Sequence, residues 1–235
     1  MDEAKKIALI TGASDGIGSE IAIELAKKKT HVIISGRKLS GLEITEDKIK
    51  SNGGTCTIAQ LDMTDFIGID RLGIEIFKRW GKLDILIANA AILGTLGPIH
   101  HQSSEEFFDV ININLLSNHR LIRSFDSLLK KSNFSKALFL SSSVGSIPKP
   151  FWGAYAVSKS GLDHMVKIWA EENKTNNLSI TIINPGKTRT KMRLKAMPGE
   201  NQDMLPSANF MAKKITNLIF LDKKQKNITV DLNDL

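Results

Sequence analysis

The amino-acid sequence predicts an α/β fold with one parallel sheet, and three observations support this expectation. Short segments rich in Ile, Val and Leu alternate with longer segments of helical periodicity along the whole chain, as in parallel sheets whose strands are joined by helices. No linker, internal repeat or change in composition interrupts the alternation. The length of 235 residues and the 42% share of hydrophobic residues suit a single domain, residues 1–235, with a sizeable core.

The predicted strands are short apolar segments, as expected of strands that are buried on both faces of a sheet. They cover residues 7–11, 31–35, 55–60, 83–88, 137–142, 179–184 and 228–231. Helices are predicted between them because apolar residues recur there every three or four positions, as Ile17, Ile21 and Leu25 do in the first. The predicted helices cover residues 17–29, 39–51, 66–80, 104–131, 154–173 and 207–221. Residues 187–206 lack this periodicity and are too long for a simple connector, so we expect a substrate lid loop there.

The composition argues against several classes of protein. The single cysteine, Cys56, rules out an internal disulfide and a zinc site built on several thiolates, and we expect no metal. The first residues lack the features of a signal peptide, and no uncharged apolar run reaches about 18 residues. We therefore expect a cytoplasmic protein without membrane contact. The net charge of +7 attracts polyanions, but aromatic residues are only 6%, which argues against a nucleic-acid partner.

A glycine-rich segment, residues 11–18, joins the first predicted strand to the first helix. Glycines permit a tight turn and let the backbone approach a pyrophosphate, and the helix N-terminus offers free N–H groups. The segment therefore predicts a dinucleotide site, although its spacing departs from the common G-x-G-x-x-G pattern. Residues 12–16 also match the G-x-S-x-G elbow of α/β-hydrolases, with Ser14 as nucleophile. Only thirteen residues precede Ser14, too few to build the oxyanion loop of a hydrolase, so hydrolysis is a remote alternative.

The end of the second strand indicates which dinucleotide is preferred. Sites that prefer NAD usually place Asp or Glu about 20 residues past the glycines, whereas this chain has Arg37. A guanidinium pairs bidentately with a 2′-phosphate, so Arg37 with Ser14 favours NADP, with NAD as the alternative cofactor. A solvated arginine is the other interpretation of Arg37. Asp62, after the third strand, either accepts a hydrogen bond from the adenine amino group or caps the next helix.

Catalytic chemistry is predicted after the fifth strand. Ser142 lies at its end, Tyr155 follows thirteen residues later, and Lys159 comes one helical turn further. Positions four apart share a helix face, so Lys159 is expected beside Tyr155, the only tyrosine of the chain. An adjacent ammonium would lower the phenol pKa from its usual value near 10, as a proton donor at neutral pH requires. Ser142 would hydrogen-bond a substrate carbonyl.

Together with Asn89-Ala90, Asn114 and Pro185-Gly186, these motifs resemble the short-chain dehydrogenase/reductase superfamily. Its members carry a Thr-Gly-x-x-x-Gly-x-Gly loop, an Asn-Asn-Ala-Gly segment and a Ser with Tyr-x-x-x-Lys in this order. The resemblance covers nearly the whole chain. It implies a three-layer Rossmann-type fold with sheet order 3-2-1-4-5-6-7, and an enzyme that transfers hydride between a nicotinamide, here NADP(H), and a small carbonyl or alcohol.

The resemblance also implies a role for each site residue. Tyr155 is expected to be the general acid/base, Lys159 to lower its pKa and hold the nicotinamide ribose, Ser142 to orient the carbonyl, and Asn114 to anchor a water of a proton relay. The residues expected to contact the cofactor are Thr11, Gly12, Ser14, Gly16, Ile17, Gly18, Arg37, Asp62, Met63, Asn89, Ala90, Tyr155, Lys159, Pro185, Gly186, Thr188 and Thr190.

Two departures from the family pattern limit these expectations. Ala91 stands where the family usually has glycine, which leaves the shape of that loop open because alanine needs an ordinary φ. Residues 230–235 lack the glycine-containing tail that usually follows the last strand. Since that region often joins subunits in the family, the expected homodimer or homotetramer is left open as well. A non-catalytic NADP-binding or sensing module is the alternative function.

The sequence suggests only a general character for the substrate site. Apolar side chains are expected to form its walls: Leu93, Phe151, Trp152, Met192 and Met197. Lysines and arginines alternate from position 187 to 195. They indicate either an anionic substrate or a solvated loop face.

Overall fold

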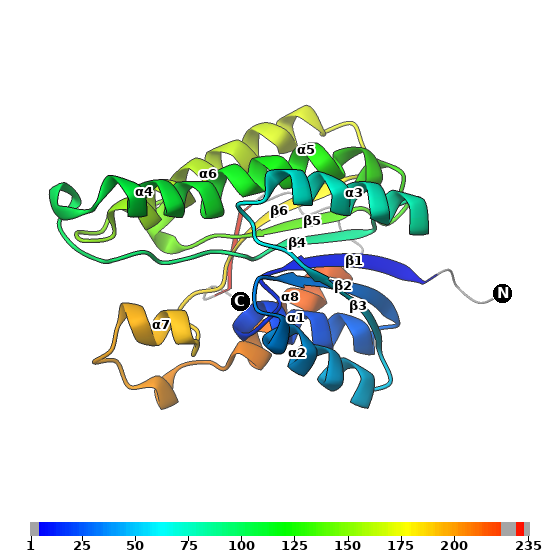
Figure 1. Cartoon of the computed structure of the whole chain (residues 1–235), viewed down its shortest axis with the longest axis horizontal. Helices are drawn as coiled ribbons and strands as arrows, with labels where there is room; N and C mark the ends of the chain where they lie inside the picture. The colour runs from blue at the N-terminus through cyan, green and yellow to red at the C-terminus, as the bar shows by residue number, and fades with distance from the viewer. Residues whose placement is uncertain (1–4, 222–228, 233–235) are drawn as a thin grey trace.

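The structure is a computed structural model of the chain and describes residues 5–221 and 229–232. Within these residues a seven-stranded sheet lies between two layers of helices (Figure 1). All neighbouring strands pair in parallel, in the order β3-β2-β1-β4-β5-β6-β7. The predicted fold class and strand order are therefore confirmed.

Each predicted strand is present, with ends shifted by a few residues. The strands are β1 (Lys6–Thr11), β2 (Thr30–Gly36), β3 (Thr55–Gln60), β4 (Ile85–Ala88), β5 (Lys136–Leu140), β6 (Ser179–Asn184) and β7 (Thr229–Asp231). Ile228, the first residue of the last predicted strand, lies outside the described residues. The central strands are almost entirely apolar because both of their faces are covered by helices.

The helices include the predicted ones and some additional short turns. They are α1 (Gly16–Lys27), α2 (Leu39–Ser51), α3 (Phe66–Trp80), α4 (Ser104–Ile111), α5 (Ser117–Lys130), α6 (Gly153–Glu172), α7 (Lys191–Ala196) and α8 (Ala208–Ile219), with the short turns η1 (Ile99–His101), η2 (Asn112–Leu116), η3 (Ser143–Gly145) and η4 (Gln202–Met204). No helix among the described residues is long and apolar enough to cross a membrane.

Two predicted segments differ from the structure. The helix predicted over residues 104–131 is divided into α4 and α5 by the π-helical turn η2. Hydrogen bonds of Asn114 to Ile92 and Ser158, which are distant in the sequence, hold this turn, so the local apolar period does not predict it. The loop predicted over residues 187–206 contains α7 and η4. The six residues of α7 are too few to show a helical period.

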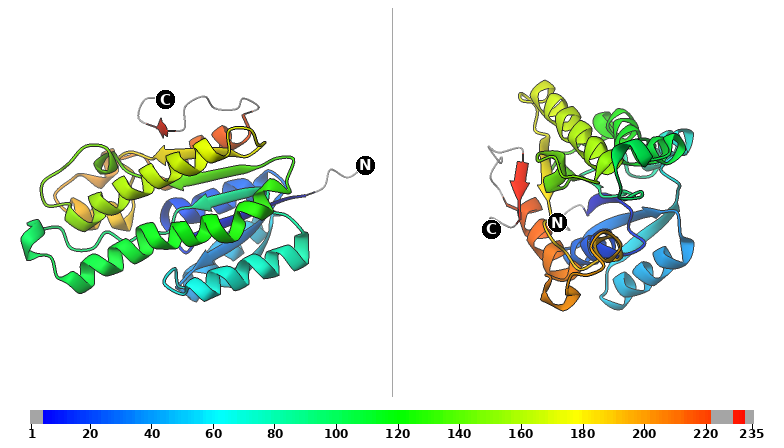
Figure 2. Two further views of the ribbon diagram at one scale, coloured as in Figure 1. Left: turned by 90° about the horizontal axis from the view of Figure 1, so that it is seen from above. Right: turned by 90° about the vertical axis from the view of Figure 1, so that its left-hand side faces the viewer.

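The core consists of two apolar layers, one on each face of the sheet. On one face α1, α2 and α8 pack over alternate strand residues such as Ile10 and Ile34. On the other face α3, α5 and α6 cover Leu9, Ile33 and Phe139. The right-hand view of Figure 2 shows α1, α2 and α8 (blue and orange) on the opposite side of the molecule from α5 and α6 (green). Parallel strands with both faces covered leave the ends of the sheet as the place for a ligand.

Candidate active site

A groove follows the carboxyl ends of the strands, where the chain order of the sheet reverses between β1 and β4. Three cavities make up this groove. The outer cavity reaches Arg37, the central cavity contains Lys159, and the inner cavity contains Ser142. Gly12 and Ser14 line both the outer and the central cavity, and Tyr155 lines both the central and the inner one. Ligands of open α/β sheets bind at such a reversal point.

The groove brings together most of the predicted site residues. Those on its walls are Gly12, Ser14, Gly16, Ile17, Arg37, Asp62, Met63, Asn89, Ala90, Ser142, Tyr155, Lys159, Pro185, Gly186, Thr188 and Thr190. Three predicted residues do not line it: Thr11, Gly18 and Asn114.

Thr11 and Gly18 lie directly behind the groove wall. The hydroxyl of Thr11 is buried and accepts hydrogen bonds from the backbone N–H groups of Asn89 and Ala90, both at 3.1 Å. A Cβ atom on Gly18 would stand 2.4 Å from Asn89 Nδ2 and from the carbonyl oxygen of Gly12. Both residues thus set the shape of the glycine loop.

The glycine loop itself passes close to the end of β4. Gly12 has a φ of 66°, and a Cβ there would lie 2.8 Å from Ala90 Cα, so only glycine fits without strain. The side chain of Asn89 fixes the loop by donating hydrogen bonds to the carbonyl oxygens of Thr11 and Gly12, at 3.0 and 3.1 Å. No side chain caps the N-terminus of α1, so its first backbone N–H groups are available to bind an anion.

Ala91 does not distort the segment after β4. It lines the outer and central cavities and is absent from the described residues with positive φ. The loop therefore forms with an ordinary backbone at this position, and the question raised by the missing glycine is resolved in favour of a normal groove wall.

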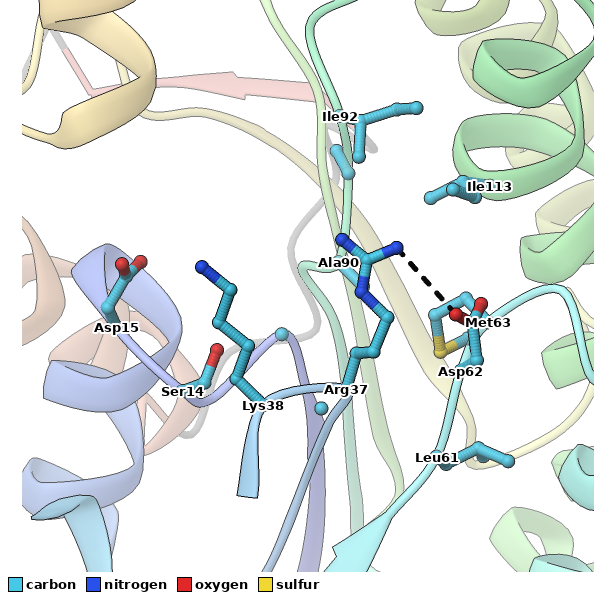
Figure 3. Close-up of a pocket in the computed structure, with 13 residues that line it drawn as sticks. Ser14, Asp15, Arg37, Lys38, Leu61, Asp62, Met63, Ala90, Ile92 and Ile113 are labelled. Atoms are coloured by element: carbon cyan, nitrogen blue, oxygen red, sulfur yellow. Dashed lines mark ion pairs between the residues drawn. The ribbon is translucent and has the colours of Figure 1, made fainter. Parts of the chain in front are cut away.

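The outer cavity carries Arg37, the cation that the sequence predicts there, and a second cation, Lys38 (Figure 3). Arg37 is two-thirds exposed, and its guanidinium lies 3.8 Å from a carboxylate oxygen of Asp62. Lys38 lines the same cavity, near Ser14 and Asp15. Lys38 is not among the residues predicted from the sequence. Its signal was its position directly after Arg37 at the end of β2.

Asp62 holds the turn that precedes α3. One of its carboxylate oxygens accepts hydrogen bonds from the backbone N–H and the hydroxyl of Thr64, at 2.9 and 2.8 Å. The bond from the Thr64 backbone is the main cause of a pKa below the usual range for this carboxyl. The helix cap is provided by Asp65, which accepts from the backbone N–H of Gly68 at 2.8 Å. The capping alternative for Asp62 is therefore wrong.

Tyr155, Lys159 and Ser142 meet where the central and inner cavities join. Tyr155 lies in the first turn of α6, and Lys159 follows on the same helix face with its ammonium 5.8 Å from the centroid of the Tyr155 ring. That ammonium donates a hydrogen bond to the carbonyl oxygen of Leu140, at the end of β5, at 2.7 Å. A hydrogen bond from Ser142 also reaches Tyr155.

The predicted downward shift of the tyrosine pKa is wrong for the structure described here. Burial raises the pKa of Tyr155 to about 12, and the hydrogen bond with Ser142 opposes this only in part. Burial also lowers the pKa of Lys159 to about 8, while Asp163 on the next turn favours its charged form. The Lys159 ammonium, 5.8 Å from the ring centroid, does not offset this desolvation, which disfavours the phenolate and so raises the pKa of the phenol.

Asn114 lies within η2, out of contact with the groove. Its side-chain oxygen accepts from the backbone N–H of Ile92 at 2.8 Å, and its amide donates to the carbonyl oxygen of Ile92 at 2.9 Å and to Ser158 Oγ at 3.0 Å. The side chain thus ties the segment after β4 to α6. π-Turns inside helices often mark functional positions, and here the turn brings the Asn114 side chain into contact with Ser158 of α6.

The far end of the groove is closed by the segment after β6. Pro185 and Thr190 line both the central and inner cavities, and Thr188 lines the inner one. Thr190 also caps α7 by accepting from the backbone N–H of Arg193 at 3.1 Å. This cap fixes the start of α7 against the groove.

Four of the five alternating cations of this segment form an ion pair with an acidic side chain. Lys191 Nζ lies 3.0 Å from Asp15 Oδ2, across the groove mouth. Arg189 pairs with Asp203 at 3.2 Å, and Arg193 makes two hydrogen bonds with Glu200, at 2.5 and 2.7 Å. The pairs of Arg189 and Arg193 fold the segment onto itself, and the pair of Lys191 ties it to the residue before α1.

Comparison with known proteins identifies the family. The family model described as short chain dehydrogenase matches residues 6–201. The chain belongs to the short-chain dehydrogenase family. Members of this family are oxidoreductases that bind a nicotinamide cofactor.

Relatives of this short-chain dehydrogenase span most of its length. It is 34% identical to the uncharacterized oxidoreductase YciK of Escherichia coli over 203 aligned residues. The alignment covers 85% of this chain and 80% of YciK. It is 32% identical to the 3-oxoacyl-acyl-carrier-protein reductase FabG of Rickettsia bellii, over 97% and 93% of the two chains. A short chain dehydrogenase of Shigella flexneri, solved in complex with NADP, superposes with a TM-score of 0.92 at 32% identity. The superposition covers 96% of this chain and 95% of the Shigella chain.

Proposed function

We propose that this short-chain dehydrogenase is an NADPH-dependent reductase of carbonyl compounds that also catalyses the reverse oxidation of the alcohol. The observation that carries the proposal is the position of Tyr155. Its side chain lines both the central and the inner cavity, with Lys159 on the central side and Ser142 on the inner side. A proton donor between two adjoining cavities suits a reaction between a cofactor in one and a substrate in the other.

The residues of the outer and central cavities fit a dinucleotide. The loop around Gly12 leaves no room for a Cβ, and the uncapped N-terminus of α1 faces the groove; both features suit a pyrophosphate. Pro185, Gly186, Thr188, Thr190 and Lys159 would hold the nicotinamide half where the central cavity passes into the inner one. When bound, the nicotinamide supplies or accepts the hydride.

In the proposed reduction Tyr155 gives its hydroxyl proton to the substrate oxygen, and Ser142 donates a hydrogen bond to that oxygen. The raised pKa of Tyr155 keeps the phenol protonated until transfer. The ammonium of Lys159 then stabilises the phenolate that remains. The proposed role of Asn114 in a water relay rests on the family resemblance, and its bonds to Ile92 and Ser158 support a structural role beside it.

NADP is the proposed cofactor, with NAD as the alternative. Arg37 and Lys38 offer two cations at the outer cavity, where a 2′-phosphate would find charge-assisted hydrogen bonds. Relatives from Shigella flexneri and Escherichia coli have been solved with NADP and NADPH, which supports the same choice here.

The hydrolase alternative has no support in the groove. Among the described residues that line its three cavities there is no histidine to activate Ser14, and a serine nucleophile needs such a base. The alternative of a non-catalytic binding module is distinguished from a reductase by whether bound NADPH is turned over. The homodimer or homotetramer and the cytoplasmic location stay predictions.

Replacing Tyr155 by Phe tests the proposed function, because the change preserves ring volume and removes the proton. Purified protein is assayed with NADPH against aldehydes, ketones, quinones and 3-oxoacyl thioesters. We expect turnover to fall by about 10²- to 10⁴-fold while calorimetry shows NADPH binding unchanged. Retained turnover in Tyr155→Phe would refute the mechanism. Binding of NADPH by the wild type without turnover of any compound would favour the binding module.

A further inference from the structure

Apolar side chains form part of the lining of the inner cavity. Leu93, Trp152 and Met192 line it, as does Ala196 from the end of α7. Leu93 and Trp152 are almost fully buried and form a small apolar cluster together with Tyr155, against which Met192 and Ala196 pack. Polar side chains line the cavity as well: Ser141, Ser142, Tyr155, Asn184, Thr188, Thr190 and Arg193.

A single charged side chain lines this cavity among the described residues, that of Arg193. Its guanidinium is mostly buried and is held by both carboxylate oxygens of Glu200, at 2.5 and 2.7 Å. Glu200 is also mostly buried, and Lys187 approaches it only to 3.9 Å. A bidentate carboxylate occupies the fork of donors that would otherwise recognise an anion.

We propose that the substrate is an uncharged carbonyl compound with an apolar group, and that the Arg193–Glu200 pair enforces this choice. This inference rests on the proposed function. An apolar group finds partners in Leu93, Trp152 and Met192. A carboxylate would enter a cavity whose lining cation, Arg193, is already paired with Glu200, and burial of an unpaired charge is costly. Because Glu200 already occupies the donors of Arg193, this guanidinium lines the cavity but does not attract an anionic substrate.

A matched pair of probes tests the wild-type preference: methyl 4-formylbenzoate and 4-formylbenzoate, which share a skeleton and differ in charge. Turnover is followed by NADPH oxidation, and binding to the NADP⁺-loaded protein by titration. We expect kcat/KM and affinity to favour the ester by about tenfold or more. Equal or better performance of the acid would overturn the inference.

Glu200→Gln tests the part played by the ion pair. The variant leaves the Arg193 guanidinium facing the cavity without its carboxylate, so the ester-to-acid ratio should fall by about tenfold. The matched control is Asp203→Asn, which removes the same charge from the same segment but frees Arg189, a residue outside the cavity. The control should keep the wild-type ratio. An unchanged ratio in Glu200→Gln, or an equal fall in both variants, contradicts the role of the pair.

The outcomes separate this inference from the proposed function. If both probes are reduced with no preference for the ester, the substrate class is wrong and the reductase stands. If the ester binds preferentially and is not reduced, while other carbonyl compounds are also left unreduced, the proposed function fails and the binding preference stands. If neither probe binds, the inner cavity is not the substrate site and the inference falls.

Discussion

At the scale of single residues, Lys159 is held in a place that is unfavourable for a charge. Its side chain is 3% exposed, and the Leu140 carbonyl is the hydrogen-bond acceptor that its ammonium reaches. Burial lowers its pKa from 10.5 to about 8. Asp163, buried one turn further along α6, favours the ammonium and limits this shift.

The lowered pKa of Lys159 predicts how the free energy of unfolding depends on pH. Between about pH 8 and 10.5 the unfolded chain keeps this lysine protonated and the folded protein does not, so the unfolded state binds more protons. The free energy of unfolding should therefore rise with pH in this window, by about 3 kcal/mol from this group. Urea unfolding of the wild type and Lys159→Met at several pH values measures the difference.

Lys213→Met is the control for that experiment, because Lys213 is exposed on α8 in the opposite helix layer. Its pH profile should follow the wild type. A Lys159→Met profile that runs parallel to the wild type from pH 8 to 10.5 would show that the buried lysine does not titrate in this range.

The two cations of the outer cavity lead to a prediction about cofactor choice. Arg37→Ala and Lys38→Ala should each raise the Kd for NADPH by about tenfold, since a charge-assisted hydrogen bond to phosphate is lost, and should leave the Kd for NADH nearly unchanged. Fluorescence titration measures both. Arg71→Ala, an exposed arginine on α3 paired with Asp65, is the matched control. Equal losses for NADPH and NADH would place the phosphate elsewhere.

At the scale of elements, the turn from β1 to α1 depends on its close approach to the end of β4. The side chain of Asn89 occupies the space that a Cβ on Gly18 would need, 2.4 Å away. A substitution there displaces either Asn89 or the Gly12 carbonyl, and both form the groove wall.

Gly18→Ala is therefore expected to weaken NADPH binding by about tenfold or more and to lower the free energy of unfolding by about 1–3 kcal/mol. Gly97→Ala is the control, because a Cβ at that position meets nothing within 4 Å and its φ is not positive. Calorimetric titration and urea unfolding give the two quantities. Wild-type values for Gly18→Ala would mean that the loop is not as tightly packed as described.

The elements also show where sequence patterns lose information. The strands and long helices were predictable because burial on one or two faces imposes a period on their residues. The π-turn around Asn114 was not, because it is fixed by contacts with Ile92 and Ser158, which are distant in sequence. Helix α7 was missed because its short length gives no period and its cap at Thr190 lies in an irregular segment.

At the scale of the whole molecule, the site forms because parallel strands deliver their following residues to one edge of the sheet. This explains why residues as far apart as Gly12, Arg37, Tyr155 and Pro185 could be predicted to share a groove. The electrostatics could not be predicted in the same way. The pKa of Tyr155 depends on its burial, and the pairing of Arg193 with Glu200 depends on how the segment after β6 folds back.

A crystal structure of the protein with NADPH would show whether Tyr155 lies between the bound cofactor and the substrate cavity. We predict the 2′-phosphate at Arg37 and Lys38, the pyrophosphate at the N-terminus of α1, and the nicotinamide beside Tyr155 and Lys159 with the inner cavity left for substrate. A nicotinamide bound away from Tyr155, or a Tyr155 hydroxyl that the bound cofactor seals off from the inner cavity, would contradict it.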